Sequence, residues 1–373
     1  MIPDPGTAHT SAPLGRATLT VDLATVQANV RTLVGALPGV EIIGVTKVTC
    51  GAPEVARAML AGGVTAIADS RLENIERMRT AGVAAPFWLL RASPPALADD
   101  VVRLADVSLE SEPQTVAALG AAAVRAGRTA RPHRILAMVD LGDLREGMLP
   151  EALPSFIADT STIDGIEITG IGTSLTCYGG VVPSEENLGR LVELAEEAEQ
   201  RLGTACEGRR LVVSGGMSSS IELALAGRMP ARVDNLRIGE SIILGVSTVT
   251  REPLPGLRTD AVTLAVPVIE CARKPSMPRG EIVQDAFGRV PNFEDRGVRR
   301  RAICALGRQD APPEGLRPLD PRIEVLGASS DHLILDVDAL PEAPVVGDAV
   351  EFVPNYAATL ALFTSSYVEK RFR

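Results

Sequence analysis

The sequence predicts an α/β protein, a (β/α)8 TIM barrel followed by a smaller C-terminal β domain. From about residue 17 to residue 245, short apolar runs alternate with amphipathic helical patterns, which implies a parallel sheet. Roughly eight such units fit into about 230 residues, a length typical of a TIM barrel. After about residue 246, alternating strand patterns separated by Pro, Gly and Asp turns replace the helices. A doubly wound open sheet is the alternative to the barrel.

The length of 373 residues exceeds what one hydrophobic core usually supports, so more than one domain is expected. We predict a disordered tail at residues 1–15, a barrel at residues 16–245 and a β domain at residues 246–373. The stretch Met1–Pro13 is rich in Pro, Thr and Ala and lacks the basic-then-apolar layout of a signal peptide.

The predicted elements follow in chain order. A strand over Ala17–Asp22 precedes a helix that Pro38 and Gly39 terminate, and the strand Glu41–Lys47 precedes a helix that begins near Pro53. Further barrel strands are predicted at Val64–Ala68, Pro86–Leu90, Asp106–Leu109, Ile135–Asp140, Ile166–Gly172, Leu211–Ser214 and Asn235–Ile238, and the clearest helix between them at Ser184–Leu202. The β-domain strands are predicted at Val262–Val268, Arg322–Leu326, His332–Val337 and Ala349–Val353.

Composition excludes several classes of function. A net charge of −10 and 3% aromatic residues disfavour nucleic-acid binding, which needs basic and stacking side chains. No apolar stretch approaches 18 residues, so no membrane-spanning helix is expected. Five cysteines without a CxxC pair are typical of reduced thiols, and we expect a cytoplasmic protein. Three histidines are too few for a histidine-rich metal site, and no metal is expected.

Lys47 stands out among the basic residues. Of 37 basic side chains only three are lysines, Lys47, Lys274 and Lys370, and Lys47 ends a predicted buried strand. In a TIM barrel the carboxyl ends of the strands form the active face. A partly buried amine there suits nucleophilic chemistry, because burial favours the neutral form of an amine. The alternative is a lysine that extends its stem along the strand end and keeps its charge in water.

Two glycine- and serine-rich segments resemble an anion-binding cradle. Ser214–Ser220 follows one predicted strand, and Leu236–Ser241 spans the end of the last one. Small residues let backbone N–H groups approach a phosphate, and TIM barrels often bind phosphate after their last two strands. One such loop alone is usually a plain turn. Two loops together with the strand-end lysine indicate pyridoxal 5'-phosphate, bound covalently through Lys47 and held by its phosphate.

The chain resembles the fold-type III pyridoxal phosphate enzymes of the alanine racemase superfamily, and within them the ornithine racemase group. The resemblance covers nearly the whole chain after residue 15. It rests on the segments Gly44–Gly51, Ala68–Ile75, Met138–Gly147, Leu175–Gly179, Val213–Ser220, Asn235–Ser241, Asp285–Gly288 and Gly327–His332.

The resemblance implies a role for each matching residue. Lys47 matches the Schiff-base lysine, and Arg237 matches the arginine that faces the pyridine nitrogen and keeps it unprotonated. The phosphate loop matches Ser218, Ser219, Gly239 and Glu240, with backbone contacts expected at the last two because a carboxylate repels phosphate. Tyr356 is assigned to the cofactor site as well.

Arg145 matches an arginine that faces the substrate, and we assign it to both catalysis and substrate binding. A structural ion pair with Asp140 or Asp143 is the alternative. Tyr178, Asp310 and Asp331 are assigned to the substrate as well.

The sequence departs from alanine racemase at the second catalytic base. That enzyme takes a tyrosine from the partner subunit's β domain, but Val283–Gly288 here contains Asp285 and Phe287 and no tyrosine. The stacking histidine after the barrel strand is also missing, and Gly172–Tyr178 stands in its place. We place the second base at Asp285 and expect burial against Phe287 to raise its pKa. The alternatives are Asp331, Tyr178, Cys177 and Cys50.

The sequence therefore predicts a racemase for a basic amino acid, ornithine by resemblance, that uses two bases to transfer the α-proton. A second substrate ammonium could bind Asp285, Asp310, Asp331 or Glu146. An active site completed by the partner subunit implies a homodimer. Two alternatives remain. A fold-type III lyase would need a metal held by His332 and Cys304 with a further ligand, and a cofactor carrier without turnover would end after the barrel.

Overall fold

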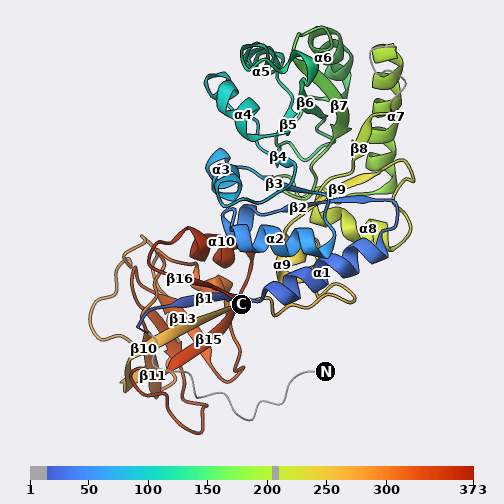
Figure 1. Cartoon of the computed structure of the whole chain (residues 1–373). Coiled ribbons are helices and arrows are strands. Elements are labelled where there is room, and N and C mark those ends of the chain that lie inside the picture. The colour runs from blue at the N-terminus through green and yellow to red at the C-terminus, as the bar shows by residue number, and fades with distance from the viewer. Residues whose placement is uncertain (1–14, 204–209) are drawn as a thin grey trace. The chain divides into compact units, whose positions relative to one another are not determined.

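The computed structural model describes residues 15–203 and 210–373. The expected tail at residues 1–15 falls, apart from Gly15, outside the described residues. The chain divides into two compact units, which are described separately (Figure 1). One is continuous, Leu23–Thr259, and the other joins the N-terminal segment up to Asp22 to Asp260–Arg373.

The unit Leu23–Thr259 is a closed barrel of parallel strands, which confirms the predicted fold (Figure 1). Closure follows from the pairing of the first and last strands, where Ile43 lies opposite Arg237. The barrel strands are β2 (Glu41–Val45), β3 (Ala66–Asp69), β4 (Phe87–Leu89), β5 (Val107–Glu110), β6 (His133–Met138), β7 (Ile166–Gly172), β8 (Val212–Ser214) and β9 (Asn235–Ile238).

Helices alternate with these strands along the chain. They are α1 (Leu23–Ala36), α2 (Pro53–Gly62), α3 (Leu72–Thr80), α4 (Ala98–Leu104), α5 (Pro113–Arg125), α6 (Leu153–Thr160), α7 (Glu185–Leu202), α8 (Ile221–Leu225) and α9 (Glu240–Leu244). Local sequence sets their ends. Pro53 occupies the first turn of α2, and Gly63 ends this helix in the left-handed conformation, with φ +115°. Ser184 caps α7 in a reciprocal pair with Asn187.

A layer of apolar side chains from neighbouring strands fills part of the barrel. It includes Val45, Ala68, Trp88, Leu109 and Met138, all buried. Alternate residues on β5, Ser108 and Glu110, are buried outside this apolar cluster. The barrel interior is therefore a packed core, and the polar residues suited to chemistry are expected at the carboxyl ends of its strands.

In its described residues, 15–22 and 260–373, the second unit has an eight-stranded sheet and one α-helix. Its strands are β1 (Thr18–Val21), β10 (Val262–Pro275), β11 (Val298–Cys304), β12 (Leu316–Pro318), β13 (Glu324–Ala328), β14 (Leu333–Asp336), β15 (Ala349–Pro354) and β16 (Glu369–Phe372), and its helix is α10 (Tyr356–Thr364). The four predicted β-domain strands all form, within a sheet that is antiparallel except for the parallel pair β1 and β16.

The first predicted strand forms but does not belong to the barrel. Strand β1 pairs with β10 and β16, and its side chains Leu19 and Val21 are fully buried. The barrel unit therefore begins at Leu23 instead of residue 16 and extends to Thr259 instead of residue 245. The reason is that the partners of β1 lie more than 200 residues later in the chain, beyond the reach of a local pattern.

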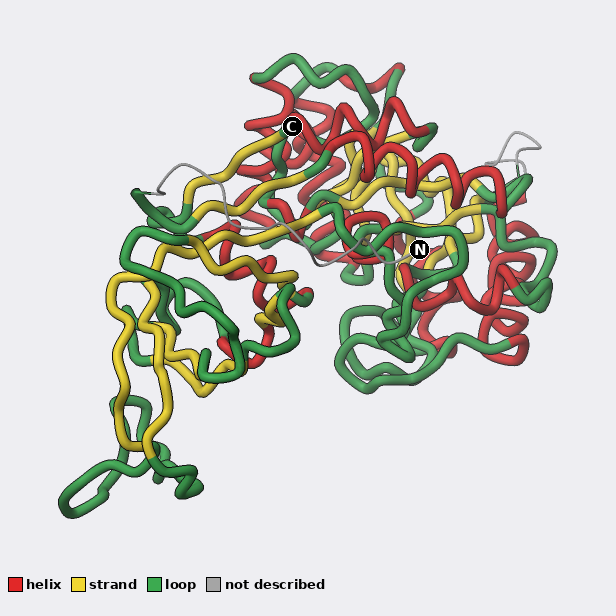
Figure 2. Tube along the Cα trace, turned by 90° about the horizontal axis from the view of Figure 1, so that it is seen from below, coloured by secondary structure: helices red, strands yellow, loops and turns green. Residues whose placement is uncertain are grey.

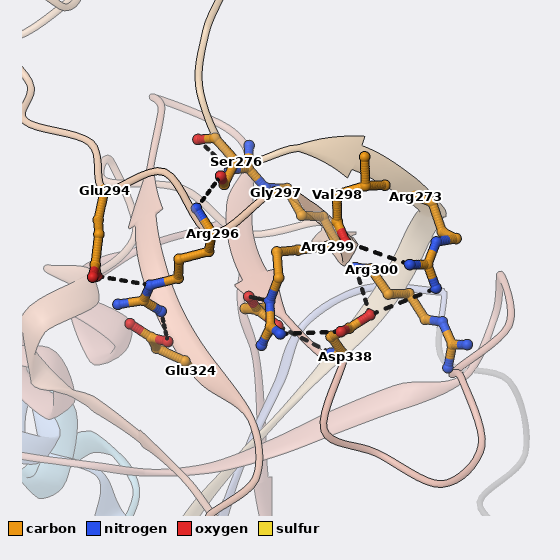
Figure 3. A network of polar contacts seen from close by, with 12 residues as sticks. Arg273, Ser276, Glu294, Arg296, Gly297, Val298, Arg299, Arg300, Glu324 and Asp338 are labelled. Carbon is orange, nitrogen blue, oxygen red and sulfur yellow. Dashed lines mark hydrogen bonds and ion pairs between the residues drawn. The ribbon is translucent and has the colours of Figure 1, made fainter.

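Strands β10 and β11 form a long hairpin arm with an extended loop, residues 276–297, at its tip (Figure 2). Charged pairs lie where this loop joins strand β11 (Figure 3). Arg299 contacts Asp338 at 3.1 Å, and Arg296 contacts Glu324 at 2.6 Å. The same loop carries Asp285.

No helix within residues 15–203 and 210–373 is both long enough and apolar enough to cross a membrane.

Candidate active site at the carboxyl ends of the barrel strands

Lys47 lies just beyond the carboxyl end of β2, as the first residue of a short 3-10 turn, Lys47–Thr49. Thr46 anchors this turn. Its Oγ1 donates a hydrogen bond to Oδ2 of Asp69 at 2.8 Å, and its carbonyl accepts one from the backbone N–H of Thr49 at 2.9 Å. The Lys47 side chain is half-buried and forms no hydrogen bond or ion pair with any residue that the structure describes. The turn is therefore held in place, and the Lys47 amine is available for reaction.

Asp69 is a buried neighbour of the lysine turn to which the sequence pattern assigned no role. It is fully buried at the end of β3 and accepts hydrogen bonds from Thr46 and from Asn74 Nδ2, the latter at 3.0 Å. Burial raises the pKa of this carboxyl group, although the hydrogen bonds oppose the shift. Its position at a strand end was visible in the sequence, but its contact with Thr46 depends on the pairing of β2 with β3.

The two predicted anion-binding loops meet beside Lys47. Ser218 Oγ lies 3.4 Å from the backbone nitrogens of both Gly239 and Ser241. A Cβ atom on Gly239 would lie 2.9 Å from Cβ of Val45, so only glycine lets the end of β9 approach the end of β2 this closely. Ser219 instead donates its hydroxyl hydrogen to the carbonyl of Leu175 at 3.1 Å, which leaves it no hydroxyl donor for a phosphate.

The Glu240 side chain is turned toward Arg251, 2.6 Å from Nη1. Burial raises the pKa of the Glu240 carboxyl group, and the charges of Arg251 and Lys47 oppose this shift. Its carboxylate is thus neutralised by an arginine, and its backbone N–H at the start of α9 is the group suited to an anion.

Arg237 is buried within the barrel end. One guanidinium nitrogen donates to Ser214 Oγ, and the other donates to the carbonyl of Thr173 at 2.6 Å and to Ser174 Oγ at 3.3 Å. Burial lowers the pKa of Arg237 to about 10, with a further contribution from the charge of Arg145. The group remains a cation at neutral pH, which suits a role opposite an unprotonated ring nitrogen.

The residues around Lys47 fit a phosphorylated aldehyde. Lys47 offers an amine without a partner among the described residues, and Arg237 offers a fixed positive charge. Ser218 accepts the backbone N–H groups of Gly239 and Ser241, so its own hydroxyl hydrogen can be donated to a phosphate. Thr173 adds a buried hydroxyl, Oγ1, with no partner in the described structure. Leaving a buried hydroxyl without a hydrogen-bond partner costs free energy. The polar groups here are therefore arranged for a polar ligand.

Arg145 lies on the loop after β6 and contacts residues of the loop after β7. Nη1 lies 3.0 Å from Sγ of Cys177, and Nη2 contacts the carboxylate of Glu146. The alternative of an ion pair with Asp140 or Asp143 is wrong, because those two carboxylates accept backbone N–H groups instead. Tyr178 follows Cys177 on an exposed turn, with its side chain 79% exposed.

Four of the predicted site residues lie in the β-sheet unit. Asp285 is exposed, and the expected rise in its pKa is wrong, because hydrogen bonds from the backbone of Arg289 and Phe287 lower that pKa. Asp310 is buried and accepts a hydrogen bond from Ser365 Oγ at 2.7 Å. Asp331 contacts Gln309 and Ser330. Tyr356 is half-buried at the start of α10.

Within residues 15–203 and 210–373, no group of three or more His, Cys, Asp or Glu side chains is arranged to hold a metal ion. His332 contacts Ser329 through Nδ1 at 3.3 Å, and Cys304 is fully buried in β11.

Known proteins with similar sequences are amino-acid racemases. The family described as alanine racemase, N-terminal domain, matches residues 21–246. The chain is 42% identical over 327 residues to ornithine racemase from Acetoanaerobium sticklandii, covering 87% of this chain and 90% of that protein. It is 37% identical over 354 residues to lysine racemase from Thermotoga maritima, covering 94% of this chain and 97% of that protein.

Solved structures share the fold at low sequence identity. Alanine racemase from Streptomyces coelicolor superposes with a TM-score of 0.72 at 21% identity, covering 96% of this chain and 98% of that chain. Alanine racemase from Bartonella henselae, solved with covalently bound pyridoxal phosphate, gives 0.73 at 18% identity, covering 96% and 100%.

The barrel, the strand-end lysine and the two small-residue loops define a pyridoxal phosphate-dependent enzyme of fold type III. The chain belongs to the alanine racemase family. It is an isomerase, an amino-acid racemase, and its cofactor is pyridoxal 5'-phosphate.

Proposed function

We propose that this protein interconverts the L- and D-forms of ornithine, with lysine as a related substrate. The observation that carries the proposal is the meeting of Lys47, Arg237 and the Ser218–Gly239 contact at one end of the barrel. The substrate class rests on the similarity to an ornithine racemase and a lysine racemase, both of which act on diamino acids.

Lys47 serves one face of the substrate in this proposal. When bound, the cofactor withdraws electrons from Cα and so lowers the cost of losing the α-proton. Lys47 would hold the cofactor between turnovers, and its Nζ, once free, would carry the proton on its own side of Cα. Thr46 and Asp69 keep the lysine turn in position, which limits the distance the proton travels.

Arg237 and Arg145 provide two fixed positive charges. Arg237 would lie opposite the ring nitrogen of the bound cofactor, and its hydrogen bonds to Thr173 and Ser214 hold the guanidinium in one orientation. Arg145 faces the substrate and binds its α-carboxylate, a geometry for which a guanidinium is suited. Tyr178 and Tyr356 contribute to the substrate and cofactor sites respectively.

Asp285 carries the proton on the opposite face. Its Oδ1 accepts two backbone N–H groups of its own turn, each at 2.9 Å. No hydrogen bond to Oδ2 is found among the described residues, so this oxygen can accept a proton. The lowered pKa makes Asp285 a weak base in the exposed arm, and burial at an interface would oppose that shift.

A second copy of this chain supplies that interface. The tip of the hairpin arm exposes apolar side chains on both sides of Asp285, among them Val283 (67% exposed), Phe287 (46%) and Val290 (72%). Exposed apolar groups of this size typically mark an interaction surface. We infer a homodimer in which the arm of one subunit covers the site of the other.

We also place the protein in the cytoplasm. Cys177, Cys271 and Cys304 are free thiols, which is typical of a reducing compartment.

The decisive experiment is a chiral assay of the purified protein with added cofactor. L-Ornithine should give D-ornithine and approach a one-to-one mixture, with deuterium entering at Cα from D2O. Formation of 2-oxobutyrate and ammonia from threonine, whose β-hydroxyl can leave as water, without racemisation of ornithine would instead establish a lyase. Absence of any reaction with ornithine and lysine would exclude the proposed substrate class.

A further inference from the structure

The loop that carries Glu146 is held tightly at both ends. The backbone N–H of Asp140 donates to the carbonyl of Met148 at 2.8 Å, and that of Met148 donates to the carbonyl of Met138 at 2.9 Å. Gly147 has φ +132°, and a Cβ atom there would lie 2.6 Å from the Asp140 nitrogen. The backbone next to this glycine therefore has a well-defined position at the carboxyl end of β6.

Asp143 joins this loop to the one after β7. Its carboxylate accepts the backbone N–H groups of Cys177, Tyr178 and Val181 at 2.9–3.3 Å. Burial acts to raise the pKa of Asp143, but these hydrogen bonds outweigh it and the pKa is lowered. A charged Asp143 thus keeps both loops together and places Arg145 and Glu146 on one platform.

The charges at this platform are matched to a diamino acid. The charge of Arg145 lowers the pKa of buried Arg237, and the charge of Glu146 raises it. Both side chains therefore lie close enough to Arg237 to interact with its charge. An α-carboxylate needs a cation, which Arg145 supplies. The side-chain ammonium adds a third positive charge to a site that already has two, and it requires an anion.

Most other carboxylates at the barrel strand ends are already committed. Asp69 is buried against Thr46, Asp140 accepts the N–H groups of Gly142 and Leu144, and Glu240 is paired with Arg251. Glu110 is fully buried, away from the apolar cluster that fills the barrel. Glu146 differs, because its side chain is 34% exposed and its partner is the substrate-facing Arg145.

We propose that Glu146 binds the side-chain ammonium of the substrate and so sets the preference for diamino acids. The proposal rests on the proposed racemase function. A carboxylate has lone pairs for several donors, so Glu146 can contact Arg145 and an ammonium group at once. Asp310 and Asp331, two of the four acids that the sequence offered for this role, accept hydrogen bonds within their own unit instead.

The test compares ornithine with norvaline, which has the same carbon chain without the terminal amine. In Glu146→Gln, the ratio of kcat/KM for ornithine to that for norvaline should fall roughly tenfold to hundredfold, the usual effect of losing one charge-assisted hydrogen bond. Most of the change should lie in KM for ornithine. Binding of α-methylornithine, which has no α-proton, should weaken by a similar factor in calorimetry.

Glu151→Gln is the matched control, because it removes a nearby exposed glutamate outside the platform. Its substrate ratio should equal that of the wild type. An equal loss for ornithine and norvaline in Glu146→Gln would overturn the proposal and make Glu146 a positioning residue for Arg145. A wild type inactive on both ornithine and lysine would defeat the proposed function itself, an outcome separate from that of the variant.

Discussion

The carboxylate of Glu240 lies 2.6 Å from Nη1 of Arg251, although Glu240 begins the helix at the predicted phosphate site. The Glu240 side chain is 13% exposed, whereas that of Arg251 is 65% exposed. An uncompensated carboxylate beside a phosphate would repel it, so the arginine makes this glutamate tolerable there.

Removal of this arginine should weaken cofactor binding. We expect Arg251→Gln to raise the dissociation constant of pyridoxal phosphate by a few-fold to about tenfold, as the exposed arginine is partly screened by solvent. The double variant with Glu240→Gln should recover most of the loss, because the repelling charge is gone. Fluorescence titration of the apoprotein measures both. Equal affinities in Arg251→Gln and the double variant would show that Glu240 does not act on the phosphate.

Lys47 should be the residue that binds the cofactor covalently. Borohydride reduction of the holoenzyme and peptide mapping should place the pyridoxyl group on Lys47, and Lys47→Ala should lose racemisation by several orders of magnitude, of the kind seen when a covalent nucleophile is removed. Labelling of Lys274 or Lys370 would contradict this. Lys274 contacts Glu270 in β10, and Lys370 contacts the carbonyl of Ser365, so neither has the free amine of Lys47.

Arg237 should control the choice of reaction more than cofactor binding. Arg237→Glu places a carboxylate where the ring nitrogen is expected and favours its protonation, which should slow racemisation and increase side transamination. Pyridoxamine phosphate released per D-ornithine formed is the measurement. Arg237→Lys, which keeps a positive charge but loses the paired donors to Thr173 and Ser214, is the control and should shift this ratio less. An unchanged ratio in Arg237→Glu would mean that the guanidinium does not face the ring.

Much of the barrel was predictable because its information is local. An apolar run followed by a helical period identifies each βα unit, and all eight predicted runs from Glu41 onward became barrel strands. The position of Lys47 just beyond a barrel strand follows from the same pattern, since it needs only the end of one strand. The membership of β1 in the other unit was not predictable, because an apolar segment does not specify which distant strand it pairs with.

Side-chain partnerships were the part that the sequence could not provide. Glu240 and Arg251 are 11 positions apart across a turn, and Thr46 and Asp69 meet only through the pairing of two strands. The environment of Asp285 was predicted wrongly for a similar reason. An aspartate near phenylalanine suggested burial, but the turn places its carboxylate in solvent, bonded to its own backbone.

Glu110 should make the stability of the protein depend on pH. Burial raises its pKa from 4.5 to about 7, so the folded state favours the protonated acid. The stability that Glu110 contributes to the folded state is fully present below pH 4.5 and is lost as the pH rises through about 7. A shift of about 2.5 units corresponds to at most about 3 kcal/mol.

Glu110→Gln should therefore raise the melting temperature at pH 8 and change it little at pH 4.5. His133, which contacts Ser108 on the neighbouring strand, acts in the opposite direction. Burial lowers its pKa from 6.5 to about 4, so its contribution is lost as pH falls through that range. Melting temperatures of the wild type and of Glu110→Gln, measured across pH 4–8, separate the effect of Glu110 from that of His133. An equal difference in melting temperature at every pH would refute the assignment to Glu110.

Asp285 is the residue whose role most needs a direct measurement. If Asp285 is the second base, Asp285→Asn should lower kcat in at least one direction, and the loss of α-deuterium from the two enantiomers should become unequal. If it instead binds the substrate's ammonium, KM for ornithine should rise while norvaline is spared. Asp295→Asn, in the same arm but bonded to Ser276 and the backbone of Gly297, is the control. Normal rates in both directions would remove Asp285 from the site and make Tyr178 and Asp331 the next residues to test.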